Sequence, residues 1–112
     1  MGVIISKLVF KTGYEDTPDP PPDFFSIKMN DLEGSEIDFE TFRDKYKAFL
    51  IVNVASRWGL TDLNYKELVR LDNEFGPKGL KIIGVPSKQF MDQEYSCESD
   101  IAAFARRQGA KF

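Results

Sequence analysis

The sequence predicts an α/β fold in which a β-hairpin is followed by a strand, a helix, a second strand and a second helix. Segments 25–30 and 36–40 alternate apolar with polar residues, as strands with one buried face do. Two continuous apolar runs, 48–55 and 80–85, are rich in β-branched residues and too short for most helices. Apolar residues at helical spacing lie between these runs and again near the C-terminus.

Residues 1–22 are expected to form a disordered, acidic and proline-rich leader, with the folded domain spanning 23–112. The prolines at 18 and 20–22 exclude a helix and favour an extended spacer. Met1 to Ser6 fit the N-myristoylation pattern at Gly2. That pattern is short and common, so a plain leader is the favoured interpretation.

The hairpin is expected to bury one face. Phe25, Ile27 and Met29 alternate with polar residues before the turn 31–34, and Ile37 and Phe39 alternate after it. A short polar turn of helix is expected over Thr41–Tyr46.

The run Ala48–Ala55 is interpreted as a central strand buried on both sides. A helix is expected to begin near Thr61 as its N-cap, with Leu68, Leu71 and Phe75 on one face, and to stop at Gly76-Pro77.

The run Leu80–Val85, ending at Pro86, predicts a second strand. Strand, helix and strand in this length form a βαβ unit with a parallel pair. A last helix is expected to start near Ser96 or Ser99, to bury Ile101, Phe104 and Ala105, and to end at Gly109 after Arg106 and Arg107.

This layout places chemistry at the carboxyl ends of the parallel strands, where open α/β sheets bind ligands. Two segments lie there, Ser56–Thr61 after the first strand and Pro86–Glu94 after the second. Periodicity and topology give this location but no reaction.

Composition excludes several classes of site. The net charge is −3 and no basic run is present, which argues against nucleic-acid binding. Cys97 is the only cysteine and there is no histidine, so neither a disulfide framework nor an ordinary zinc site nor a His-activated nucleophile is expected. No apolar stretch is long enough to span a membrane. A lone cysteine favours a reducing, cytoplasmic location.

Two motifs at the predicted site resemble the glutathione peroxidase family. The segment Asn53–Thr61, followed by Asn64-Tyr65 and Leu68, is similar to the family signature N-V-A-S-x-(Cys or selenocysteine)-G-x-T, then N-Y and L. The segment Val85–Glu94 is similar to F-P-C-N-Q-F-G-x-Q-E. The resemblance runs from about Phe24 to Phe112 and implies the N-terminal two-thirds of a thioredoxin-like domain, truncated before its last strands and helix.

The resemblance implies the reduction of hydroperoxides with glutathione or thioredoxin as reductant and no other cofactor. It places the peroxide-attacking cysteine or selenocysteine at Trp58 and a hydrogen-bond donor to the developing charge at Gln93. An indole has no atom that ionises or takes up oxygen, so the chain as written is expected to be inactive. The family's Trp-Asn pair would lie beyond Phe112, and the resolving cysteine of thioredoxin-dependent relatives would fall at Arg106.

Several alternatives remain open at this point. Trp58 has three alternative explanations. The first is that a UGA selenocysteine codon, one base from the tryptophan codon UGG, has been read as tryptophan. The second is a true substitution in a catalytically inactive paralogue, and the third is that the indole simply occupies the former pocket as an aromatic plug. Cys97 is a poor substitute nucleophile, because free cysteines usually behave as small hydrophobes. For Gln93 the alternative is a structural role, in which its side-chain amide hydrogen-bonds to backbone groups of its own loop. The alternative functions are a non-catalytic binding module and a truncated gene product that self-associates through an exposed sheet edge.

Overall fold

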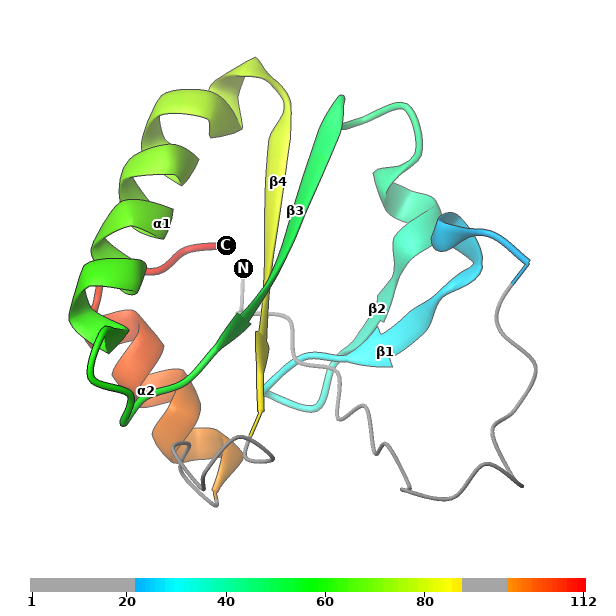
Figure 1. The fold of residues 1–112 in the computed structure, drawn as a ribbon. Coiled ribbons are helices and arrows are strands. Elements are labelled where there is room, and N and C mark those ends of the chain that lie inside the picture. Colours follow the sequence, from blue (N-terminus) through cyan, green and yellow to red (C-terminus); the bar gives the residue numbers. More distant parts are fainter. Residues whose placement is uncertain (1–21, 88–96) are drawn as a thin grey trace.

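The computed structural model describes residues 22–87 and 97–112 as an α/β arrangement with the predicted order of elements (Figure 1). The elements are η1 (Phe24–Ser26), β1 (Lys28–Asn30), β2 (Glu36–Asp38), η2 (Phe39–Phe42), β3 (Ala48–Val54), α1 (Thr61–Phe75), η3 (Gly76–Lys78), β4 (Leu80–Pro86) and α2 (Glu98–Arg107), where η denotes a 3-10 helix. The predicted leader, including Gly2, lies outside the described residues apart from residue 22.

The hairpin β1–β2 is antiparallel, with Met29 opposite Ile37 on its apolar face. Its turn is fixed by the side chain of Asp31, whose Oδ1 accepts hydrogen bonds from the backbone N–H groups of Glu33 and Ser35, both at 2.9 Å. Gly34 has φ of 82°, a conformation that glycine adopts without steric penalty. The predicted hairpin is therefore confirmed.

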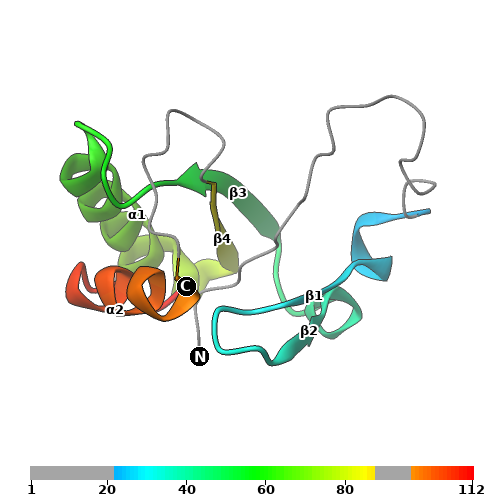
Figure 2. The same ribbon diagram turned by 90° about the horizontal axis from the view of Figure 1, so that it is seen from below.

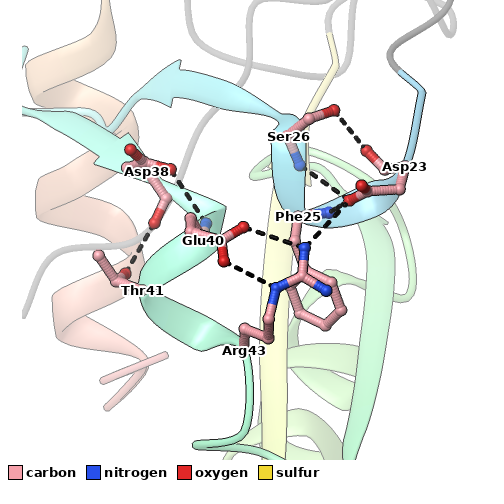
Figure 3. Close-up of polar contacts among 7 residues, drawn as sticks. All are labelled: Asp23, Phe25, Ser26, Asp38, Glu40, Thr41 and Arg43. Atoms are coloured by element: carbon pink, nitrogen blue, oxygen red, sulfur yellow. Dashed lines mark hydrogen bonds and ion pairs between the residues drawn. The ribbon is translucent and has the colours of Figure 1, made fainter.

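The strands of the hairpin are shorter than predicted, because two aspartates begin 3-10 helices at their outer ends. Asp23 Oδ1 accepts from the backbone N–H of Phe25 at 2.7 Å, and Asp38 Oδ1 accepts from that of Glu40 at 3.0 Å (Figure 3). Such local hydrogen bonds compete with strand pairing. The apolar positions 25 and 39 thus lie in η1 and η2, and the turn predicted over Thr41–Tyr46 is found earlier, as η2 over Phe39–Phe42.

Arg43 holds these two 3-10 helices together. Its guanidinium makes two hydrogen bonds to the Glu40 carboxylate, at 2.7 and 3.0 Å, and lies 3.7 Å from Asp23 Oδ1 (Figure 3). The same group sits 4.5 Å from the centre of the Phe25 ring. The described fold thus begins with a segment tied back to η2.

Strands β3 and β4 pair in parallel, from Ala48 opposite Leu80 to Val54 opposite Pro86. This confirms the predicted βαβ unit. The prediction that 48–55 is buried on both sides is wrong for the described residues: Ile51 is 55% exposed, and β4 is the only strand that pairs with β3 there. The more buried strand is β4, whose residues Lys81 to Gly84 are all buried.

Figures 1 and 2 show the two helices on one face of this sheet and the hairpin on the other. On the helix face, Val54 and Ile82 pack with residues of both helices and with the C-terminal Phe112. The Phe112 ring comes so close to Gly84 that a Cβ there would lie 3.4 Å from it. On the hairpin face, Ile83 packs with Phe39 and Phe42.

Both predicted helices are present. Helix α1 ends at Phe75, directly before Gly76-Pro77, and buries Tyr65 and Leu68. Helix α2 buries Ile101, Ala102 and Ala105, carries Arg106 and Arg107 in its last turn, and is followed by Gly109 at φ of 83°. Phe104, predicted to be buried, is partly buried and packs against the same core as α1.

Candidate active site at the start of helix α1

The two segments predicted to form the site follow β3 and β4 at the same end of the sheet. Val54 ends β3 directly opposite Pro86, the last residue of β4. The backbone N–H of Ser87 donates to the carbonyl of Val54 at 3.3 Å. Gln93, the second predicted site residue, lies outside the described residues, so only the first motif has a described geometry.

Thr61 fixes the loop that carries position 58. Its Oγ1 accepts a hydrogen bond from the backbone N–H of Trp58 at 2.8 Å and donates one to the carbonyl of Ala55 at 2.7 Å. The backbone N–H of Thr61 donates to the carbonyl of Trp58 at 3.0 Å. The backbone of Trp58 is therefore held directly at the start of α1.

This arrangement corrects the predicted role of Thr61. The N-cap position belongs to Leu60, and the Thr61 side chain caps no N–H group inside the helix. Its hydroxyl turns back to the loop and is 4% exposed with the rest of the residue. Only the tertiary structure reveals this role, because an N-capping threonine and a loop-holding threonine look alike in sequence.

A cleft of about 430 Å³ lies between the end of β3 and the first half of α1. Its walls are mainly apolar, with Trp58 at the loop and Asn64 and Glu67 as polar residues on α1; the lining residues are Val52, Asn53, Val54, Ala55, Trp58, Thr61, Asn64, Tyr65, Glu67 and Leu68. The Trp58 side chain is 45% exposed, so the indole borders the cleft and remains open to solvent.

Position 58 is electrostatically suited to an anion. It lies three residues before the first residue of α1, near a helix N-terminus where aligned peptide dipoles produce a positive potential. A thiolate or selenolate placed there would be stabilised, and its pKa would fall. The indole of Trp58 makes no use of this potential, because it has one N–H donor and no ionisable group in the physiological range.

Cys97 precedes helix α2 and is exposed. Its Sγ lies 2.9 Å from Ser99 Oγ. The hydrogen bond with the Ser99 hydroxyl lowers the pKa of the Cys97 thiol below its ordinary value, and the backbone N–H groups of Ser99 and Asp100 add to this effect. Cys97 is not among the residues that line the cleft beside Trp58.

Arg106, where the resemblance places a resolving cysteine, forms an ion pair with Glu33 of the hairpin turn. Both side chains are exposed, so this contact joins α2 to the hairpin at the surface. Residues 22–87 and 97–112 contain no group of three or more His, Cys, Asp or Glu side chains arranged to hold a metal ion. In the same residues, neither α1 nor α2 has the length and apolar character needed to cross a membrane.

The chain matches the family model described as glutathione peroxidase over residues 24–112. It is 38% identical over 89 residues to "Probable glutathione peroxidase 8" of Tetraodon nigroviridis, and this aligned region covers 80% of this chain and 41% of that protein. It is 39% identical over 87 residues to "Probable phospholipid hydroperoxide glutathione peroxidase" of Mesembryanthemum crystallinum, covering 78% and 50%. Mouse "Glutathione peroxidase 7" is 36% identical over 85 residues, covering 76% and 45%.

The chain spans about half the length of these curated relatives. The family match nevertheless covers the hairpin, both parallel strands, both helices and the loop at position 58. With this match and with relatives above one-third identity, the chain belongs to the glutathione peroxidase family.

Proposed function

We propose that this chain carries the nucleophile-bearing half of a hydroperoxide-reducing site, with a thiol or selenol at position 58 in the active form and glutathione or thioredoxin as reductant. With Trp58 in that position the chain does not reduce peroxide. The observation that supports this proposal is the place of position 58, held by Thr61 at the N-terminus of α1 and bordering an open cleft.

The proposed reaction needs an anion at position 58. A thiolate or selenolate attacks one oxygen of the hydroperoxide, a sulfur–oxygen or selenium–oxygen bond forms, and the O–O bond breaks. The leaving alkoxide takes a proton and departs as the alcohol. Two thiol equivalents then reduce the sulfenic or selenenic acid, releasing water and forming a disulfide. In this scheme the Gln93 amide donates a hydrogen bond to the charge that develops during the attack.

The two origins of Trp58 give the proposal different consequences. A UGA codon followed by a selenocysteine insertion element would mean that the active protein is a selenoprotein. A UGG codon would mean a true substitution and a paralogue without peroxidase chemistry. Sequencing the gene at this codon and downstream of it distinguishes the two. A reducing, cytoplasmic compartment would supply the thiol reductant and suits the exposed Cys97 thiol.

The direct test restores a thiol at position 58. Trp58→Cys in a Cys97→Ser background is compared with Phe75→Cys in the same background, because Phe75 is exposed at the opposite end of α1. The helix potential should lower the thiol pKa at position 58 and raise it at position 75. We expect sulfenic acid to form at least about tenfold faster at position 58 at neutral pH, as measured by peroxide-dependent thiol loss.

The unmodified chain provides the second half of the test. It should consume no hydrogen peroxide or lipid hydroperoxide above the rate without protein, with either glutathione or a thioredoxin system present. Turnover that disappears with Cys97→Ser would overturn the proposal and assign the reaction to Cys97. Equal reactivity of the thiols at positions 58 and 75 would overturn the role of the helix terminus.

A binding function is the second candidate, and the exposed indole at the cleft favours it. Tryptophan is enriched among the residues that dominate binding energy at interfaces. Trp58 is the only tryptophan, so its fluorescence reports directly on this cleft. A protein captured by the wild-type chain but lost with Trp58→Ala, and retained with Phe75→Ala, would support this function. Capture that ignores the Trp58 substitution would exclude this cleft as the binding site.

A further inference from the structure

Lys81 is a buried lysine on the hairpin face of the sheet. It is the second residue of β4 and is only 7% exposed. Its Nζ lies 5.8 Å from the centre of the Phe42 ring and 6.0 Å from that of the Tyr46 ring. Lysine is almost never buried to this extent, because taking an ammonium group out of water costs free energy. A lysine in this position is suited to chemistry that an exposed lysine performs poorly.

The surroundings of the Lys81 side chain are aromatic. Phe42, Tyr46 and Phe49, here called the aromatic cluster, contact one another with ring centres 5.6 to 6.2 Å apart. Phe49 lies directly opposite Lys81 in the parallel pairing of β3 with β4. Rings of this kind form an environment of low polarity, which disfavours the charged ammonium relative to the neutral amine.

Lys45 places a second positive charge beside the aromatic cluster. Its Nζ lies 5.4 Å from the centre of the Tyr46 ring, the same ring that the Lys81 ammonium contacts. Burial lowers the pKa of Lys81; attraction by Asp72 on α1 partly opposes this effect, and repulsion from Lys45 adds to it. Desolvation and a neighbouring cation are the two features that activate a lysine as a nucleophile toward carbonyl compounds.

We propose that Lys81 forms a reversible Schiff base with a small apolar aldehyde inside the aromatic cluster. The lone pair of the neutral amine attacks the carbonyl carbon, and a C–N bond forms. Both amine protons then leave with the carbonyl oxygen as water, and a neutral imine remains. Addition of water to the imine reverses the reaction and returns the amine and the aldehyde.

The surroundings of Lys81 favour this class of ligand. A neutral imine avoids the cost of burying an ammonium and removes the repulsion with Lys45, although it gives up the attraction of Asp72. The alkyl group of the aldehyde gains apolar contact with the rings. The small exposure of Lys81 disfavours bulky or charged carbonyl compounds. This site lies on the opposite face of the sheet from the cleft beside Trp58, so it does not rest on the proposed peroxide chemistry.

The test treats the full chain with propanal and cyanoborohydride at neutral pH. Cyanoborohydride reduces each imine to a stable secondary amine, and peptide mass spectrometry then gives the initial rate of modification at each lysine. Lys78 is the internal control, because its Nζ also lies over a ring, 5.1 Å from the centre of Phe75, but the residue is exposed. We expect modification of Lys81 to be at least about fivefold faster than that of Lys78.

The same comparison in urea shows whether the fold is the cause. The difference between Lys81 and Lys78 should disappear in the unfolded chain, because burial and the aromatic cluster are lost. Modification of Lys81 at the rate of Lys78 or slower in the folded chain would overturn the proposal. A difference that persists in urea would overturn it as well.

Substitution of Lys45 tests the role of the second charge. Lys45→Met should slow the modification of Lys81 by at least about twofold, whereas Lys45→Arg keeps the charge and should retain the rate. Lys47→Met is the matched control, since Lys47 is an exposed lysine in the same segment; it should leave the rate unchanged. Circular dichroism verifies that each variant is folded. Equal rates in Lys45→Met and in the unmodified chain would refute activation by the neighbouring charge.

Discussion

The two faces of the β3–β4 sheet bury side chains of different kinds. On the helix face the core is mainly aliphatic, with Ile82 and Ala105 fully buried and the rings of Tyr65 and Phe112 buried among them. On the hairpin face the core is aromatic and open: Phe39, Phe42 and Ile83 are buried, but the rings around them, Phe24, Phe25, Tyr46 and Phe49, are only partly so. The ring centres of Phe24 and Phe49 lie 4.8 Å apart, within the range of favourable aromatic pairs.

This difference indicates that the two faces stabilise the domain in different ways. The helix face buries more side chains and holds α1, whose first half borders the cleft beside Trp58. The hairpin face retains partly exposed rings that can shift to fill a gap, and it also accommodates the charge of Lys81. Substitutions on the helix face should therefore be more damaging than equivalent ones on the hairpin face.

The largest effect is expected from a pair of neighbouring residues on β4. Ile82→Ala, on the helix face, should lower the free energy of unfolding by about 3–4 kcal/mol, because Ile82 is fully buried and its neighbours cannot collapse completely around the cavity. Ile83→Ala, on the hairpin face, should cost about 2 kcal/mol, because the aromatic rings can partly fill the space. Urea unfolding monitored by circular dichroism checks both values. Equal losses would remove the proposed difference between the two faces.

A smaller effect is expected at the site loop. Thr61→Val keeps the side-chain shape but removes the hydrogen bonds with the Trp58 N–H and the Ala55 carbonyl. It should therefore lower the free energy of unfolding by about 1–2 kcal/mol and alter the fluorescence of Trp58. Thr41→Val is the control: it removes a similar hydrogen bond, to the Asp38 carbonyl, from an exposed turn on the hairpin side. It should cost less than about 0.5 kcal/mol. A greater loss from Thr41→Val would contradict this ranking.

Substitution of Lys81 is expected to stabilise the domain, in contrast to the substitutions above. Burial lowers the pKa of Lys81, an effect that Asp72 partly opposes. Between the lowered pKa and the ordinary one, the unfolded chain binds more protons, so stability should rise as pH increases through that range. Lys81→Met retains the apolar stem and removes the buried charge. It should stabilise the domain by about 1 kcal/mol at neutral pH and abolish the alkaline rise. Destabilisation by this variant would show that the ammonium contacts with Phe42 and Tyr46 outweigh its burial.

The smallest effect is expected at Asp38 in the hairpin. Its pKa is lowered, mainly by the hydrogen bond from the backbone N–H of Glu40 and further by Lys28. A lowered carboxyl pKa contributes stability above the unfolded-state value, and this contribution is lost as pH falls through the lowered pKa. Asp38→Asn should therefore flatten the loss of stability on acidification below about pH 4. Urea midpoints measured at successive acid pH values check this, and an unchanged acid slope would refute it.

Much of the fold follows from local pattern. Alternation predicted the hairpin, the apolar run Leu80–Val85 predicted β4, and Gly76-Pro77 marked the end of α1 where the structure has it. Two predictions failed for different reasons. An apolar run such as 48–55 is typical of a strand buried on both sides, yet only its neighbours decide whether it lies at an edge. The outer ends of the predicted hairpin strands form 3-10 helices in the structure, because Asp23 and Asp38 cap those helices locally.

The sequence by itself determined the family, because the motif around Trp58 is contiguous and needs no folding to be recognised. It also supplied the proposal that the nucleophile belongs at position 58. Only the tertiary structure decided that Thr61 holds the loop and that a cleft lies between the end of β3, Trp58 and the first half of α1. The reason is physical: hydrogen-bonding side chains and strand edges acquire their roles from whichever groups the fold brings within a few ångströms of them.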